Sequence, residues 1–465
     1  MTRFVSRYAW MFVLVFFAFC VVSAQERVQG GPPPEIRNHI DSFMRAYNSG
    51  NSEEWEKMAQ EHFSPAFLKR RTAEQRKEFF DRMRGDFGTI AITSVMREGP
   101  DEPLQIHVKS SNGTEAVINM TLESGAPYRI DGLGVSVGGP AQGRPQSSVP
   151  APPVNGKMSD AEIARVLDGY LQRLTADDVF SGVVLVARDG KPVYEQAYGF
   201  ADRSNRVPNT PATRFNLGSI NKKFTQIAIQ QLVARGKLSL TDTVGKVLPD
   251  YPQEVTRAAT IEQLLHHSGG VADFFGEEFA RTGKDRFRSN ADYYKLVSSQ
   301  KALFVPGTQN RYCNGCYIVL GAIIASVSGM PYEKYVEENI FKPAGMTATG
   351  AFQGDAILPD IAMGYTRRMG DGQLHSNVYL RGAAGCAAGG GFATARDLLA
   401  FENALKTGRL PDVKSDDGDE AIAGGAPGTS SVVMRNGPWT VVVLTNLDPR
   451  TGEDLGVALG RALTQ

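Results

Sequence analysis

The sequence predicts an α+β protein in two parts, each built on an antiparallel sheet with helices. A segment rich in Pro, Gly and Ser, residues 138–156, has linker composition and separates residues 33–137 from residues 157–465. The larger part has hairpin patterns near both of its ends and a long, mainly helical stretch between them. The smaller part has helical periodicity first and alternating, strand-like segments afterwards.

The composition is that of an ordinary globular chain. Of its 465 residues, 42% are hydrophobic and 22% charged, which excludes a disordered or fibrous protein. Fifty Lys and Arg balance fifty Asp and Glu, so nothing supports general binding to nucleic acid. The sequence contains no P-loop, dinucleotide fingerprint or metal-ligand spacing, and we therefore expect no cofactor and no metal.

Residues 1–24 are typical of an export signal. They begin with basic residues, continue with an apolar run from Ala9 to Val22, and end with the small-x-small pattern Val22-Ser23-Ala24. The run is short for a membrane span, so only an uncleaved signal would attach the chain to a membrane. The expected location is periplasmic or secreted.

In the smaller part, apolar residues at helical spacing from Ile36 to Tyr47 predict a first helix. A second helix is expected after Ser52, which can cap it, and a third around Phe80. Four alternating segments then predict a sheet, at residues 90–96, 104–108, 116–122 and 128–135. Asn112-Gly113 is a typical hairpin turn between the middle two. This order of elements resembles the small, cone-shaped nuclear-transport-factor-like domains, which implies a binding or accessory role.

In the larger part, Ser159-x-x-Glu162 is a capping box that opens a helix. Asp189-Gly190 and Asn436-Gly437 are hairpin turns, each between two strand-like runs. The four runs are residues 182–188, 191–199, 431–435 and 439–445. A last helix is expected over residues 454–463. We expect the first and last strands to meet in one antiparallel sheet.

Ser219 and Lys222 lie at the start of a helical pattern that ends at Gly236. A Ser and a Lys three residues apart share one face of a helix. The unpaired amides of a first helical turn favour a developing alkoxide, and a hydroxyl becomes a nucleophile when a nearby base takes its proton. The motif alone is unspecific, because Ser298 and Lys301 repeat it.

Further segments follow in chain order: the run Leu264–Gly270 with His266 and His267, Tyr312-Cys313-Asn314 before an apolar helix, and Ala388-Gly389-Gly390. With Ser-x-x-Lys, they resemble the serine β-lactamase-like hydrolases: class C β-lactamases, penicillin-binding D-peptidases and related esterases. The resemblance covers about residues 160–465 and implies a β-lactamase/transpeptidase-like fold.

The resemblance implies roles for individual residues. Ser219 would be the acylated nucleophile, and Lys222 and Tyr312 would share general-base and general-acid duty. Asn314 would orient Lys222 and the substrate. His266 and His267 are expected to be structural. Gly424 and Gly425 belong to the best match to the third family motif, residues 422–428, and the amides of Gly425 and Ser219 would stabilise an oxyanion.

The third motif is where the sequence departs from the family. Ile422 stands where relatives have a basic residue, and that cation would hold the catalytic groups in reactive protonation states and attract anionic substrates. The preceding segment is short, charged and turn-rich at residues 414–420. A strand that relatives usually place there is therefore in question.

Cys313, Cys316 and Cys386 remain after the signal. Two of them can pair in an oxidising compartment, and the sequence leaves open which two, or whether they are small buried residues. Redox and zinc interpretations of Cys313-x-x-Cys316 are disfavoured, because no second cysteine pair completes a zinc ligand set.

The leading interpretation is a secreted serine hydrolase that forms an acyl-enzyme at Ser219. Its substrates would be esters, small amides, β-lactams or D-amino-acid peptides of the peptidoglycan type. The alternative is a catalytically impaired β-lactamase-fold protein that binds cell-wall fragments or a partner, which Ile422 favours. The sequence does not predict the oligomeric state.

Overall fold

The computed structural model describes residues 33–70, 72–97, 103–111, 115–123, 125–137, 149–369, 373–412 and 421–464. Contacts divide the chain into two compact units, one of residues 1–77 and 89–139 and the other of residues 78–88 and 140–465. The signal, the Asn112-Gly113 turn, most of the linker and the charged segment before the third motif lie outside the described residues. Those expectations stay predictions.

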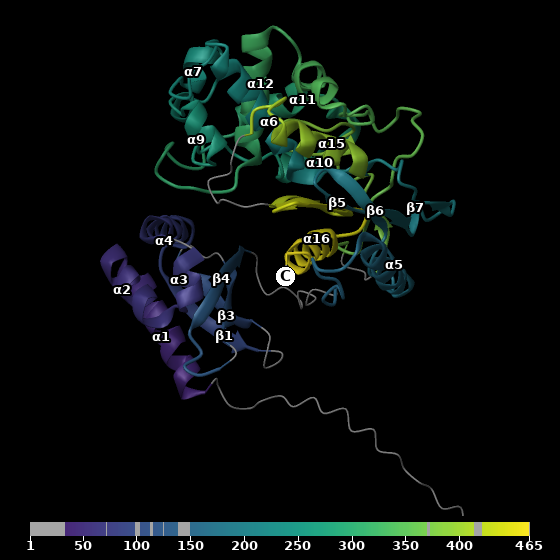
Figure 1. The fold of residues 1–465 in the computed structure, drawn as a ribbon. Coiled ribbons are helices and arrows are strands. Elements are labelled where there is room, and N and C mark those ends of the chain that lie inside the picture. The colour runs from purple at the N-terminus through teal and green to yellow at the C-terminus, as the bar shows by residue number, and fades with distance from the viewer. Residues whose placement is uncertain are drawn as a thin grey trace, which may run out of the picture. The chain divides into compact units, whose positions relative to one another are not determined.

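Residues 33–137 form helices followed by a four-stranded antiparallel sheet of order β1-β2-β3-β4 (Figure 1). The elements are α1 Pro34–Ser49, α2 Ser52–His62, α3 Pro65–Arg70, α4 Ala73–Phe87, β1 Ile90–Met96, β2 Leu104–Ser110, β3 Glu115–Leu122 and β4 Ile130–Val137. The expected cap is wrong by one residue: the Asn51 side chain accepts from the Glu53 amide, and Ser52 is the first helical residue. The short helix α3 was not predicted, because six residues are too few to show a period.

The larger unit is built on a five-stranded antiparallel sheet of order β13-β14-β15-β5-β6. Its strands are β5 Gly182–Arg188, β6 Lys191–Tyr198, β13 Ala421–Ala426, β14 Thr429–Asn436 and β15 Trp439–Thr445. Gly182 pairs with Thr445 and Arg188 with Trp439, which confirms that the first and last strands meet. Asp189 and Gly190 both have positive φ, as the predicted tight turn requires.

Helices cover both faces of this sheet (Figure 1). Helices α5, Asp160–Ala176, and α16, Thr451–Ala462, pack on the face that carries Val184 and Val186. Helices α6, Asn221–Ala234, and α15, Ala395–Lys406, lie on the other face with Val183 and Leu185. The capping box at Ser159 and Glu162 is present at the start of α5.

The segment between β6 and α15 is mainly helical and packs around α12, Asn314–Ser328, which is buried over most of its length. The remaining helices are η1 Gly218–Ile220, α7 Val244–Val247, α8 Glu254–Arg257, α9 Ile261–Leu265, α10 Glu277–Arg281, η2 Lys284–Arg286, α11 Asn290–Ser299, α13 Tyr332–Val336, η3 Glu337–Phe341 and α14 Lys342–Ala344. Short strands are β7 Phe200–Asp202, β8 Val207–Pro208, β9 Phe215–Asn216, β10 Tyr365–Thr366, β11 His375–Ser376 and β12 Phe392–Ala393. No single described helix is long and apolar enough to span a bilayer; only α12 together with residues 332–344, bent by 76°, passes that test.

Candidate active site

Ser219 lies in the turn η1, directly before α6, and its side chain is half-buried. Gly218 precedes it with a φ of 50°, a conformation that glycine adopts without strain. A Cβ atom at Gly218 would come within 2.8 Å of the Gly424 backbone. The glycine therefore lets the turn approach the edge strand β13 closely.

The structure brings the predicted catalytic side chains together around Ser219. The Ser219 Oγ accepts hydrogen bonds from Lys222 Nζ at 3.1 Å and from Tyr312 Oη at 2.7 Å. Lys222 Nζ also donates to Asn314 Oδ1 at 2.7 Å and to the Ala388 carbonyl at 2.6 Å. Lys222 is only 6% exposed. Its three acceptors match in number the three N–H bonds that a lysine ammonium can donate.

The third motif lies on β13, at the edge of the sheet and against the nucleophile turn. A Cβ atom at Gly424 would stand 2.7 Å from the Ser219 amide nitrogen, so only glycine fits there. The next residue, Gly425, is thus close to the same turn, where its amide and that of Ser219 are the candidate oxyanion donors. Ile422 is half-buried and packs against the hydrophobic core on the α6 side of the sheet.

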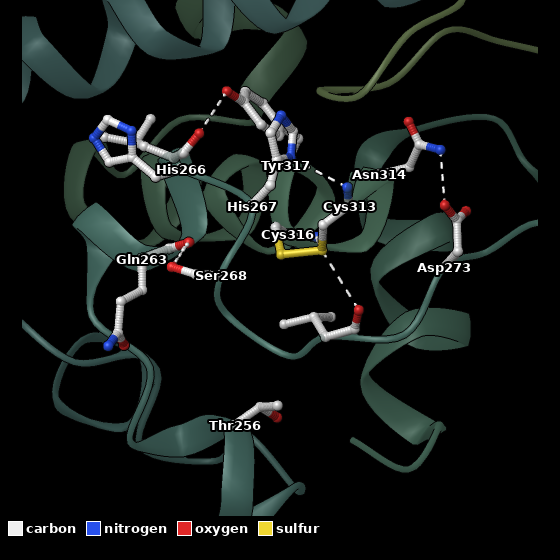
Figure 2. Close-up of a disulfide and its surroundings, with 12 residues drawn as sticks. Thr256, Gln263, His266, His267, Ser268, Asp273, Cys313, Asn314, Cys316 and Tyr317 are labelled. Atoms are coloured by element: carbon white, nitrogen blue, oxygen red, sulfur yellow. Dashed lines mark hydrogen bonds between the residues drawn. A yellow bond between two sulfur atoms is a disulfide. The ribbon is translucent and has the colours of Figure 1, made fainter. Parts of the chain in front are cut away.

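A disulfide brackets Asn314 at the start of α12. Cys313 and Cys316 are joined, while Cys386 is buried and free, which answers the question that the sequence leaves open. Figure 2 shows the Asn314 amide directed at the Asp273 carboxylate, to which its Nδ2 donates at 2.8 Å. Because Asp273 takes the amide nitrogen, the amide oxygen faces Lys222.

The His267 ring packs against the Tyr312 ring. Its Nδ1 accepts from the Cys313 amide at 3.1 Å (Figure 2), and its ring centroid lies 4.8 Å from that of Tyr312. Burial, together with the positive charge of Lys222, lowers the pKa of His267 to about 4, so the imidazole is neutral at neutral pH. It makes no hydrogen bond with Ser219 among the described contacts, and its position agrees with the expected structural role.

Two participants were not identified from the sequence: the Asp273 carboxylate and the Ala388 carbonyl. Ala388 precedes two glycines whose backbone approaches Gly218, and the Gly390 amide donates to the Gly218 carbonyl at 3.2 Å. The glycine pair was a visible signal of such an approach. Asp273 had no comparable signal beyond its place after the histidine-containing run.

The sheet and the helical subdomain together form a β-lactamase/transpeptidase-like fold. The model of the family described as Beta-lactamase matches residues 167–421, which is more than half of the chain. The chain belongs to this family.

The chain is also similar to individual penicillin-binding proteins and, in its fold, to an amidase. The chain is 34% identical over 265 residues to the "Putative penicillin-binding protein PbpX" of Bacillus subtilis (strain 168), covering 56% of this chain and 63% of that protein. The crystal structure of a penicillin-binding protein from Bacillus halodurans superposes with a TM-score of 0.56 at 29% identity, over 63% of this chain and 99% of that one. A D-amino acid amidase from Ochrobactrum anthropi SV3, complexed with L-phenylalanine, shares the fold (TM-score 0.51, 22% identity, 64% and 97% of the two chains). The chain spans less than two thirds of the length of the curated relatives that it matches first.

Proposed function

We propose that the protein is an exported serine hydrolase that works through an acyl-enzyme at Ser219. The observation that carries this proposal is the position of one oxygen: Ser219 Oγ is within hydrogen-bond distance of both Lys222 Nζ and Tyr312 Oη. Nucleophilic catalysis by a hydroxyl requires a group at this distance that takes its proton and a group that returns a proton to the leaving atom.

In the proposed reaction, Ser219 Oγ attacks the substrate carbonyl carbon as its proton passes to Lys222 in its neutral amine form or to Tyr312 in its phenolate form. The carbonyl oxygen becomes an oxyanion that accepts from the amides of Ser219 and Gly425. When the tetrahedral intermediate collapses, the bond to the leaving group breaks, and the leaving oxygen or nitrogen takes the proton. Water then attacks the acyl-enzyme by the same steps, which releases the acid and restores the serine.

The proposed substrates are esters, small amides, β-lactams or D-amino-acid peptides, and esters and small amides rank first. Ile422 leaves β13 without the cation that would bind a carboxylate beside the oxyanion donors. The fold shared with an amidase supports acyl chemistry of this kind.

Export from the cytoplasm is part of the proposal. The sequence of residues 1–24 supports it, and so does the Cys313–Cys316 disulfide, because structural disulfides persist mainly in oxidising compartments.

A second candidate function is binding of cell-wall fragments or a partner without turnover. The apolar Ile422 in the third motif is the observation that favours it. The intact hydrogen-bond network around Ser219 favours the hydrolase.

The test is intact-mass spectrometry of the protein after treatment with a fluorophosphonate and, separately, a penicillin. We expect a covalent adduct with at least one probe that is lost in Ser219→Ala, followed by turnover of esters or D-peptides. Circular dichroism of both proteins would show that they are folded. A folded protein without any Ser219-dependent adduct would refute the hydrolase and leave the binding function.

A further inference from the structure

Arg311 is a cation next to Tyr312, whereas strand β13 has Ile422 where the family has a basic residue. Arg311 directly precedes Tyr312 and is exposed. Its amide donates to the His267 carbonyl at 3.1 Å, which fixes the base of the side chain. The described residues provide no ion-pair or hydrogen-bond partner for its guanidinium.

Arg311 borders a cavity of about 60 Å³ beside Tyr312. The other lining residues are Val271, Asp273, Leu303, Phe304, Tyr312 and Cys313. A cavity of this size holds a few water molecules or one small polar substituent. Val271, Leu303 and Phe304 contribute apolar side chains to its wall, and a charge beside them interacts more strongly than it would in bulk water.

Asp273 lines the same cavity, but no ion pair joins it to Arg311 in the described structure. The Asp273 Oδ1 accepts from the Phe275 amide at 3.0 Å, and Oδ2 accepts from Asn314 Nδ2 at 2.8 Å. Each carboxylate oxygen therefore accepts a hydrogen bond from within the site, while the carboxylate keeps its negative charge. The Arg311 guanidinium has no such partner among the described residues and can donate to a ligand beside this cavity.

We propose that Arg311 is a specificity-determining residue that binds an anionic group of the substrate, a carboxylate, in the cavity beside Tyr312. An arginine forms charge-assisted and often bidentate hydrogen bonds with carboxylates. Substrate anions would thus be recognised on the Tyr312 side of Ser219, whereas Ile422 makes the β13 side apolar. The inference rests on the proposed function and names a substrate class for the same site.

The test compares kcat/KM for three esters: phenyl acetate as the neutral reference, phenyl hemisuccinate with a carboxylate on the acyl part, and 3-acetoxybenzoate with a carboxylate on the leaving group. We expect one anionic ester to be preferred, and Arg311→Gln to lower its kcat/KM relative to phenyl acetate about tenfold. The preference should also shrink as salt increases. The matched control is Arg206→Gln, an exposed arginine outside the cavity, which should leave the ratio within twofold.

A ratio that Arg311→Gln does not change, for either anionic ester, would overturn the proposal, as would an equal change in Arg206→Gln. A separate arm measures binding of both anionic esters to Ser219→Ala by calorimetry, with and without Arg311→Gln. We expect about tenfold weaker binding without the arginine. Because this arm needs no turnover, it decides the role of Arg311 even if the hydrolase proposal fails.

Discussion

At the scale of single residues, the site is a chain of dependent positions. Asp273 orients the Asn314 amide, Asn314 holds Lys222, and Lys222 reaches Ser219. A substitution at the far end of this chain changes the geometry at the nucleophile without touching it. The sequence motifs predicted the last three members, whereas Asp273 became visible only through a contact between segments distant in sequence.

Ile422 is the residue whose replacement tests the departure from the family. Ile422→Lys would add an ammonium group on the oxyanion strand, on the α6 side of the sheet. We expect the acylation rate with a neutral ester to rise several-fold, because positive charge favours the deprotonated form of Ser219. Stopped-flow acylation of Ile422→Lys, with Ile422→Met as the uncharged control of similar length, measures this rate. An unchanged or slower rate in the folded variant would show that another group already supplies this charge.

His267 predicts how stability depends on pH. Its pKa is about 4 in the folded protein, below its ordinary value of 6.5, so the unfolded chain binds a proton more readily. The contribution of neutral His267 to stability is complete above pH 6.5, declines as the pH falls to 4 and is then fully lost. The decline amounts to about 3 kcal/mol.

Urea unfolding between pH 4 and 7 measures this effect, and His267→Asn is the comparison. Asparagine tolerates the positive φ of this position, 61°, and its oxygen can accept from the Cys313 amide. We expect the pH dependence to be shallower in this variant by that amount. The same slope in both proteins would exclude His267 as its source.

At the scale of elements, the start of α12 is held from two directions. The disulfide joins Cys313 to Cys316 across the first turn, and Asp273 holds the Asn314 side chain (Figure 2). Local signals predicted such features well where they were self-contained: the capping box of α5 and the hairpin turns are present. Strand β13 is glycine-rich and lacks apolar alternation, so its pairing with β14 depends on contacts that no local pattern reveals.

Removal of the disulfide should therefore affect activity more than folding. It closes a loop of only a few residues, and its loss is expected to lower the free energy of unfolding by about 2 kcal/mol. In Cys313→Ala/Cys316→Ala we expect kcat/KM to fall about tenfold, because the turn that carries Asn314 loosens. Ester kinetics and urea unfolding measure the two effects.

Cys386→Ala is the matched control, since this cysteine is buried and unpaired. Treatment of the unmodified protein with a reductant should reproduce the effect of the double variant and should not affect the double variant itself. Equal kinetics before and after reduction would show that the disulfide does not position Asn314.

At the scale of the whole molecule, every residue of the candidate site comes from the larger unit. The turn η1 supplies the nucleophile and one oxyanion donor, the start of α12 supplies the Asn314 amide, and strand β13 supplies the other oxyanion donor. The linker composition predicted a division of the chain, and the contacts divide the described chain into two units. The nuclear-transport-factor-like resemblance of the smaller part and its accessory role stay predictions.

A shortened chain that begins at Val149 should keep the proposed hydrolase activity. Val149 and Val154 pack in the core with α5, so this start preserves that core. We expect kcat for phenyl acetate within about threefold of the value for the full chain. Circular dichroism of the shortened chain would show that it is folded. Loss of activity in a folded, shortened chain would place an essential contribution in residues 33–137.

The pairing of β5 with β15 has a consequence for how the molecule is made. Gly182 cannot pair with Thr445 until the chain through Thr445 has left the ribosome, so this pairing closes a long loop. Until then the hydrophobic edge of β5 is open to other chains. A chaperone that keeps the newly made polypeptide extended would protect this edge, and a ribosome that stalls before β15 would release a product prone to aggregate.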